Sequence, residues 1–218
     1  EKEKWFSHTL NDFINLPGSM PEKLKGDEVT AKTQWTGSLY DSSYYYNPYM
    51  EKYRKEGNIK FPFFLTPDKH YVGAAWYQKE VNIPADWKGE RILLFLERPH
   101  IETTVWVNGQ KTGMQNSLCV PHQYDITRYV RPGKCTITIR VDNRIKEINV
   151  EPDSHSITDQ TQGNWNGIVG RICLQTTPKT YFDDIQIYPE PEQKLARVKV
   201  VIKGTGTAKV KLSAESFN

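Results

Sequence analysis

Residues 103–109 read Thr-Thr-Val-Trp-Val-Asn-Gly, and this short stretch indicates the fold class. Threonine, valine and tryptophan are enriched in β-strands because their side chains pack well on a pleated surface. Asn108 and Gly109 both tolerate the positive φ angles that a two-residue type I′ turn requires. The stretch therefore predicts a β-strand that ends in a tight hairpin.

The segments on both sides repeat this short apolar rhythm. Residues 136–141 place Ile137, Ile139 and Val141 on one side and Thr or Arg on the other, which is the period of a half-buried strand. Turn signals separate such runs along the chain, and this spacing is typical of an all-β sandwich. Further strands are expected at residues 76–83, 91–96, 168–175 and 181–188.

Two short connections between these strands are specific enough to predict. Residues 125–130 are expected to form one helical or 3-10 turn that starts at Asp125 or Thr127, because both residue types cap helix N-termini well. Pro132-Gly133 then suits a type II turn, since proline fixes one φ angle and glycine supplies a positive one. A strand must start directly after it. A further short helix is expected at residues 50–55.

The composition is that of an ordered globular protein. Of 218 residues, 37% are hydrophobic and 12% aromatic, which is enough to build a full core. The net charge of +3 comes from 29 basic and 26 acidic residues, without the basic block that would neutralise a run of phosphates. No stretch approaches the roughly 20 apolar residues of a membrane span. We therefore expect neither nucleic acid nor a membrane as partner.

The potential metal ligands and nucleophiles are scattered. Cys119, Cys135 and Cys173 are odd in number and lack zinc-ligand spacing, so buried free thiols are favoured, although one disulfide stays open. The five histidines show no ligand spacing, and the chain has no glycine-rich phosphate loop. We therefore expect no metal-binding or cofactor-binding residues, while a bound calcium ion stays an open alternative.

Two stretches interrupt the strand pattern. Residues 144–163 are polar and contain Pro152, so they predict a long loop, and long loops in compact domains are often functional. Pro189-Glu190-Pro191-Glu192 is stiff and charged, which predicts a linker or domain edge. Beyond it, residues 197–203 and 208–212 are expected to form a hairpin, which is too small to bury a core of its own.

Five motifs occur in a family's order and spacing, and together they carry a resemblance. They are Tyr71 to Glu80 (YVGAAWYQKE), Val105 to Gly109 (VWVNG), Tyr124 to Thr127 (YDIT), Arg131 to Gly133 (RPG) and Trp165 to Ile168 (WNGI). With these motifs the chain is similar to the amino-terminal sugar-binding domain of family two glycoside hydrolases, and most like bacterial β-galactosidases.

The resemblance implies a domain layout. Residues 1–189 would form an antiparallel jelly-roll sandwich of the galactose-binding-domain type, and residues 190–218 a linker and the truncated start of an immunoglobulin-like β-sandwich. A (β/α)₈ barrel with two catalytic glutamates would follow in the parent enzyme. The expected partners are thus a β-galactoside-like carbohydrate and these missing domains, and a periplasmic or secreted parent is favoured.

No catalytic residue is expected within the chain itself. Asp183 and Asp184 are adjacent in a predicted strand, so their side chains point to opposite faces and cannot flank one sugar. Glu190 and Glu192 lie in the predicted linker. For all four side chains a solvated position is the expected one.

The resemblance places the candidate sugar contacts in the loop before Trp165, which would reach over the barrel mouth. Substrate-binding candidates are Asp159, Gln160, Asn164 and Trp165. Carboxylates and amides suit sugar hydroxyls because carboxylates accept hydrogen bonds and amides both donate and accept them. Without a gap, the position of the family's usual acid falls on Thr161 rather than Asp159. A plain connecting loop, with Trp165 in the core, is the alternative.

A dense aromatic stretch precedes the sandwich and is predicted to leave some rings exposed. An exposed aromatic patch needs a partner. Contact with the missing domains is favoured over an independent sugar platform. A stand-alone carbohydrate-binding module and a protein-interaction β-sandwich therefore remain alternatives. The stretch comprises Trp35, Tyr40, Tyr44, Tyr45, Tyr46, Tyr49 and Tyr53.

Overall fold

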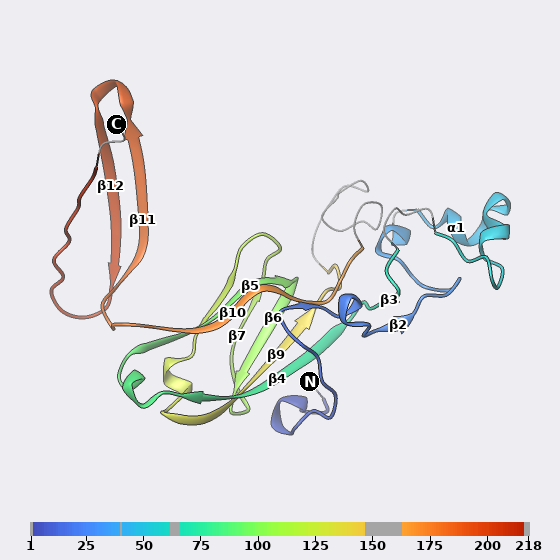
Figure 1. Cartoon of the computed structure of the whole chain (residues 1–218), viewed down its shortest axis with the longest axis horizontal. Coiled ribbons are helices and arrows are strands. Elements are labelled where there is room, and N and C mark those ends of the chain that lie inside the picture. Colours follow the sequence, from blue (N-terminus) through green and yellow to red (C-terminus); the bar gives the residue numbers. More distant parts are fainter. Residues whose placement is uncertain (1, 40, 62–65, 147–162, 216–218) are drawn as a thin grey trace.

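The computed structural model describes residues 2–39, 41–61, 66–146 and 163–215. Two four-stranded antiparallel sheets face each other and form the predicted jelly-roll sandwich (Figure 1). The first sheet has the order β1 (Gly18–Ser19), β10 (Gly167–Thr177), β5 (Arg91–His100), β8 (His122–Asp125). The second has the order β4 (Ala74–Ile83), β9 (Gly133–Asp142), β6 (Glu102–Val107), β7 (Gln110–Asn116). The all-β prediction is confirmed.

The hairpin predicted at residues 103–109 joins β6 to β7. Asn108 and Gly109 have φ angles of 49° and 78°, the positive values that the turn requires. The turn is also tied to β9, because Asn108 exchanges two hydrogen bonds with the backbone of Thr136, at 2.8 and 2.9 Å. The turn of the hairpin is therefore anchored to β9, while β7 forms one edge of the second sheet.

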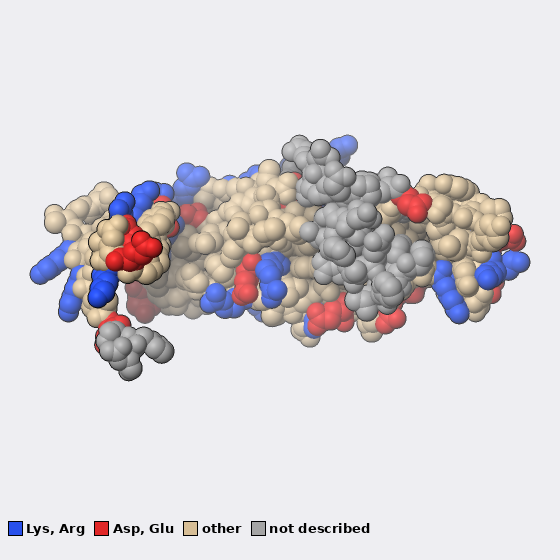
Figure 2. Space-filling model, turned by 90° about the horizontal axis from the view of Figure 1, so that it is seen from above, with Lys and Arg blue, Asp and Glu red and all other residues tan. Residues whose placement is uncertain are grey.

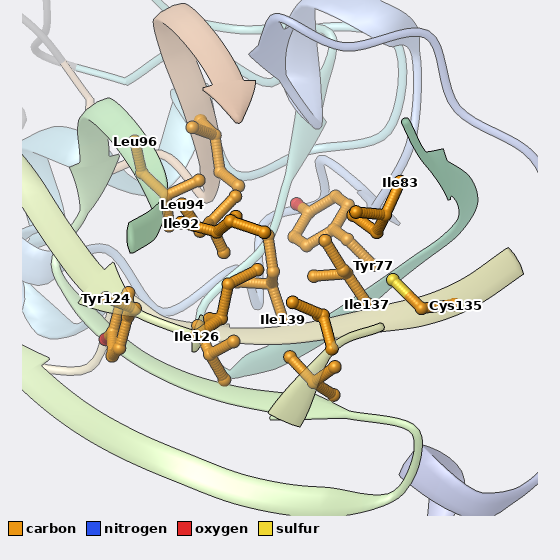
Figure 3. Close-up of a cluster of buried hydrophobic side chains, with 14 of the residues drawn as sticks. Tyr77, Ile83, Ile92, Leu94, Leu96, Tyr124, Ile126, Cys135, Ile137 and Ile139 are labelled. Carbon is orange, nitrogen blue, oxygen red and sulfur yellow. The ribbon is translucent and has the colours of Figure 1, made fainter. Parts of the chain in front are cut away.

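The core lies between the two sheets and is built from the inward residues of both (Figure 3). On β9 the predicted alternation is confirmed, since Ile137, Ile139 and Val141 are all buried. The opposing sheet contributes Ile92, Leu94, Leu96 and Ile168, and the remaining members of the buried cluster are Tyr77, Ile83, Val105, Val107, Tyr124, Ile126, Val130 and Cys135.

The predicted turns also occur. A 3-10 helix, η6, spans Thr127–Tyr129, and the Asp125 carboxylate accepts a hydrogen bond from the Thr127 backbone N–H at 3.1 Å. Gly133 follows with a φ angle of 107°, and β9 starts there. The helix expected at residues 50–55 is a 3-10 helix, η4, at Pro48–Tyr53.

The outer face of the second sheet is covered by the amino-terminal segment. Trp76 on β4 and Trp106 on β6 lie with ring centroids 5.0 Å apart on this face. Phe6, from the 3-10 helix η1 (Trp5–Ser7), stacks parallel on Trp106 at 5.2 Å, and Trp5 lies edge-on to Trp76 at 6.0 Å. Trp106 is consequently only 3% exposed, although its strand position faces away from the core.

The segment before β4 has its own aromatic cluster. Trp35 packs on Phe61 at 4.8 Å and on His70 at 4.6 Å. Tyr46 and Tyr49, in contrast, are 70% and 85% exposed, so the prediction that some rings face outward is confirmed. Tyr40 lies outside the described residues. The elements of this segment are η2 (Pro21–Lys23), β2 (Asp27–Glu28), η3 (Thr36–Leu39), α1 (Ser43–Tyr46), η4 and β3 (Lys69–His70).

The carboxyl-terminal strands form a sheet of their own. β11 (Tyr181–Glu190) pairs with β12 (Leu195–Lys203) through the 3-10 helix η7 (Pro191–Gln193), and this hairpin stands apart from the sandwich (Figure 1). The hairpin expected between residues 197–203 and 208–212 is wrong, because residues 208–212 form no strand. The division at residues 189 and 190 stays a prediction; it falls within β11, whose last residue is Glu190, and β12 follows it.

Surface charge and helix length add two observations. On the face shown in Figure 2, outside the grey atoms, basic and acidic side chains are interspersed without a large area of one sign. Within the described ranges, no helix is both long and apolar enough to cross a membrane.

The three thiols are free; Cys135 is buried as expected, but Cys119 is exposed, so the prediction of buried thiols is wrong for that residue.

Candidate functional site

The candidate site lies where β9 ends and β10 begins, at one end of the sandwich. Of the four predicted substrate-binding residues, Asn164 and Trp165 are described, immediately before β10. Asp159 and Gln160 lie outside the described residues, as does Thr161. The described part of the site is therefore built from the residues around Trp165.

Asn143 and Asn164 bind each other across the two ends of the intervening segment. The Asn143 side-chain amide donates to Oδ1 of Asn164 at 3.2 Å, and the Asn164 amide donates to the Asn143 carbonyl oxygen at 2.9 Å. Asn164 also donates to the hydroxyl of Thr36 at 3.0 Å. Both amides are buried, with exposures of 0% for Asn143 and 6% for Asn164. We call this pair the asparagine clamp.

Asn166 makes a second set of buried contacts. Its Oδ1 accepts from the Tyr77 hydroxyl at 2.8 Å, and its amide donates to the carbonyl oxygens of Gly73 and Val141, both at 3.0 Å. The side chain is fully buried, and each of its polar atoms has a partner. Burial raises the pKa of Tyr77 well above its usual value, so the phenol stays protonated and donates this hydrogen bond.

Gly167 allows β1 to approach the start of β10. Its φ angle is 153°, and a Cβ atom at this position would lie 2.4 Å from the Gly18 carbonyl oxygen. Only glycine fits such an approach without a shift of the backbone. The Asn166 carbonyl oxygen next to it accepts a hydrogen bond from the Met20 N–H at 2.7 Å. The backbone around residues 166 and 167 is thus held against residues 18–20.

Trp165 lies between the two asparagines and has a different environment. Its indole is half-buried and stacks on the His100 imidazole, with centroids 4.6 Å apart and an interplanar angle of 25°. His100 Nδ1 lies 2.8 Å from the Trp165 carbonyl oxygen. Because a carbonyl oxygen can only accept, Nδ1 carries the proton. Burial lowers the pKa of His100 to about 4, although the hydrogen bond to Trp165 opposes this, and the ring is neutral at pH 7.

A charged cluster surrounds the last residue of β9. Asp142 is fully buried, and its carboxylate contacts Arg140 at 2.6 Å, Arg144 at 2.6 Å and Lys146 at 2.9 Å. Burial alone would raise the pKa of Asp142, but hydrogen bonds from Arg144 and Lys146 outweigh it and hold the pKa below its usual range. Glu102 adds a second carboxylate, 3.2 Å from Arg140. The cluster fixes the chain just after β9.

A shallow polar hollow of about 340 Å³ opens beside β2 and β3. His70, which packs on Trp35, forms part of its wall. Glu28 ion-pairs with Lys69 on the neighbouring strand. The lining residues are Asp27, Glu28, Thr30, Lys32, Thr33, Gln34, His70 and Val72.

The acidic side chains of the β11–β12 hairpin are exposed or engaged in surface ion pairs. Asp183 and Asp184 are exposed, as predicted, and Asp183 pairs with Lys203 at 2.8 Å. Glu190 contacts Arg197 at 2.9 Å. Among the described residues, no three His, Cys, Asp or Glu side chains are grouped so that they could hold a metal ion.

Comparison with known families assigns the sandwich. The profile of the family described as "Glycosyl hydrolases family 2, sugar binding domain" matches residues 22–178, which is most of the chain and spans both four-stranded sheets except β1. The chain belongs to glycosyl hydrolases family 2. The resemblance inferred from the five sequence motifs is thereby confirmed, and the matched range forms the sugar-binding domain of this family.

Relatives of this family 2 chain include β-glucuronidases. The human β-glucuronidase is 28% identical over 168 residues, which cover 66% of this chain and 26% of that protein. The enzyme of Felis catus is 29% identical over 140 residues, or 55% of this chain and 22% of that protein. The chain thus spans about a quarter of the length of the curated relatives it matches. The sequence motifs predicted a greater similarity to β-galactosidases than to other members of the family, and this prediction stays unconfirmed.

Solved structures agree with the fold. A β-glucuronidase from an uncultured Clostridium species superposes with a TM-score of 0.58 at 20% identity, covering 93% of this chain and 30% of that one. The Ruminococcus gnavus β-glucuronidase gives a TM-score of 0.53 at 20% identity, covering 66% of this chain and 26% of that one. At this identity the likeness concerns the fold alone.

Sequence reasoning missed several residues of the site. His100, Asn143 and Asn166 were not predicted to take part, yet they hold the backbone and side chain of Trp165. One signal was present in the sequence, because Asn164 and Asn166 are two residues apart around a tryptophan. In extended backbone that spacing puts both asparagines on one side and Trp165 on the other.

Proposed function

We propose that this chain serves as the non-catalytic sugar-binding domain of a hydrolase that cleaves terminal β-glycosidic bonds. The family match over residues 22–178 supports this role. The observation that carries the proposal is the placement of Trp165, whose half-buried indole is fixed against His100 at the end of the sandwich. An aromatic ring held in this way suits the apolar face of a sugar.

The substrate class we propose first is the β-glucuronide. Its support is the set of curated relatives, which are β-glucuronidases. β-Galactosides are the second candidate, because the sequence motifs are similar to those of bacterial β-galactosidases. Retaining hydrolysis of either substrate needs two carboxyl groups about 5 Å apart, one as nucleophile and one as acid/base. In our proposal another domain of the complete protein supplies both.

We also propose that the β11–β12 hairpin belongs to a second structural unit. Its register places Ile185 opposite Val200 and Ile187 opposite Val198 on one face, and both isoleucines are more than half exposed. The opposite face carries the pairs Gln186–Lys199 and Tyr188–Arg197. An exposed apolar face of this kind marks an interaction site. A second sandwich that starts near Tyr181 and covers this face would account for it.

The test uses the complete protein encoded by the gene that carries this chain. Hydrolysis of p-nitrophenyl β-glucuronide and p-nitrophenyl β-galactoside is measured side by side. We expect turnover of the glucuronide, and we expect Trp165→Ala to raise its KM roughly tenfold, which corresponds to the loss of about one aromatic contact. Trp5→Ala is the matched control, because Trp5 is 39% exposed on the outer face of the second sheet.

Three results would change the proposal. Preferred hydrolysis of the galactoside would replace the first substrate class by the second. Absence of turnover on both glycosides would overturn the hydrolase role. An unchanged KM in Trp165→Ala would show that the sugar does not contact this residue.

A further inference from the structure

We propose that Asn164 is a positioning residue for Trp165 and not itself a sugar contact. This inference rests on the proposed function, in which Trp165 contacts the sugar. It differs from the role expected from the sequence, where Asn164 was a substrate-binding candidate of the same kind as Trp165.

The hydrogen bonds of Asn164 carry the first step. Its amide nitrogen donates to the Asn143 carbonyl oxygen at 2.9 Å and to the Thr36 hydroxyl at 3.0 Å, and its Oδ1 accepts from the Asn143 amide at 3.2 Å. A primary amide has two N–H donors, and both are used. The side chain is 6% exposed. A sugar oxygen could accept a hydrogen bond from Asn164 only by displacing one of these buried partners.

The second step concerns what the clamp holds. Asn164 precedes Trp165 and Asn166 follows it, and the side chains of both asparagines are anchored in the sandwich. The Trp165 carbonyl oxygen is held by His100, and the Asn166 carbonyl oxygen by Met20. Three consecutive residues are thus fixed by buried hydrogen bonds. The indole of Trp165 is the side chain among them that keeps partial exposure.

The third step is the link to the aromatic segment before the sandwich. Thr36 is 5% exposed and follows Trp35 directly, and Trp35 is itself buried against Phe61 and His70. The hydrogen bond from Asn164 to Thr36 therefore ties Trp165 to that cluster as well as to β9. Loss of the Asn164 amide would remove both of these ties on the amino-terminal side of Trp165 at once.

A double-mutant cycle tests the proposal in the complete protein. KM for p-nitrophenyl β-glucuronide is measured for Asn164→Ala, Trp165→Ala and the double variant. If Asn164 acts through Trp165, its substitution raises KM about fivefold in the parent protein and less than about twofold in the Trp165→Ala background, since contacting residues that share one interaction are not additive. An equal rise in both backgrounds would show a direct sugar contact and overturn the proposal.

A milder variant and a second readout guard against a folding defect. Thr36→Val removes one partner of the Asn164 amide and keeps the shape of the side chain, and we expect it to raise KM in the same direction as Asn164→Ala. With 5-fluorotryptophan incorporated, the ¹⁹F resonance of Trp165, assigned by Trp165→Phe, is expected to shift or broaden in both variants. An unchanged resonance in both variants would overturn the positioning role whether or not the protein hydrolyses glycosides.

The two proposals fail in different ways. An unchanged KM in Trp165→Ala alone would contradict the sugar contact of the proposed function. A normal effect of Trp165→Ala together with a KM for Asn164→Ala equal to that of the parent protein would contradict only the positioning role. A lower unfolding temperature in Asn164→Ala, without a change in KM or in the ¹⁹F resonance, would mark Asn164 as purely structural.

Discussion

His100 holds Trp165 twice, once by stacking its imidazole on the indole at 4.6 Å and once by donating a hydrogen bond from Nδ1 to the Trp165 carbonyl oxygen at 2.8 Å. The second contact requires a proton on Nδ1. The buried ring is neutral, and a neutral imidazole with its single proton on Nδ1 makes both contacts. A neutral histidine at this position has a consequence for the pH dependence of stability.

The first prediction concerns this pH dependence. Burial lowers the pKa of His100 to about 4 from 6.5, so between these values the unfolded state binds more protons than the folded state. The contribution of neutral His100 to the free energy of unfolding is therefore fully present above pH 6.5, and it is lost as the pH falls toward 4. We expect the free energy of unfolding to decrease by roughly 1 kcal/mol between pH 7 and pH 5.5 on account of His100.

The measurement is urea denaturation at both pH values for the parent chain and for His100→Gln. Buried His122, whose pKa is also lowered by burial, contributes in the same direction, so the difference between the two proteins isolates His100. An identical pH dependence in both proteins would contradict the assignment of a buried neutral ring at residue 100.

The second prediction concerns the buried amide of Asn166. Asn166→Ala leaves the Tyr77 hydroxyl and the carbonyl oxygens of Gly73 and Val141 without their present partner. We expect it to lower the free energy of unfolding by about 3 kcal/mol, because buried polar groups that lose their partners are costly. Asn82→Ala, at an exposed strand position, is the matched control and should cost less than about 0.5 kcal/mol. Equal losses in the two variants would refute the structural role of Asn166.

The third prediction concerns the amino-terminal cover of the second sheet. Phe6→Ala removes the ring that stacks on Trp106 and should admit water to an indole that is now 3% exposed. We expect a red shift of the tryptophan emission and a loss of about 1–2 kcal/mol of stability. Phe13→Ala, at a ring that is 85% exposed, serves as control and is expected to change neither quantity. An unshifted spectrum in Phe6→Ala would mean that Phe6 does not cover Trp106 in solution.

The fourth prediction concerns the β11–β12 hairpin. The sheet of this hairpin shares no strand with either sheet of the sandwich. A chain that ends at Pro178 should therefore keep its thermal midpoint within about 3 °C of the parent chain. A chain that ends at Asn166 lacks β10, the partner of β5 over nine register pairs, and should fail to fold. Loss of cooperative unfolding in the chain that ends at Pro178 would place the hairpin in the same folding unit as the sandwich.

The local parts of the fold could be predicted from the sequence. The hairpin at Asn108-Gly109, the alternation of β9 and the 3-10 turn after Asp125 each depend on residues that lie within a few positions of one another. Backbone preferences and side-chain period determine such features directly. The fold class could be predicted from them because several short strands separated by turns can pack into only a few compact architectures.

The remaining features depend on contacts between distant segments. Asn164 binds Thr36 across 128 residues, and Asn166 binds Gly73 across 93 residues. No local pattern specifies such pairs, so Asn164 was predicted as a sugar contact from the family resemblance and from its residue type, without these partners. The pairing of β12 was mispredicted for a related reason. The alternation of residues 197–203 suits pairing with residues 181–190 or with residues 208–212. The pairing with β11 depends on the whole register between the two strands.

The asparagine clamp also acts as a cross-link between the two sheets of the sandwich. Residues Asn143 and Asn164 join the two ends of the segment between them through buried hydrogen bonds of their own. Because β9 belongs to one sheet and β10 to the other, these hydrogen bonds cross-link the two sheets at this end of the sandwich, where no strand ladder of the described residues joins them.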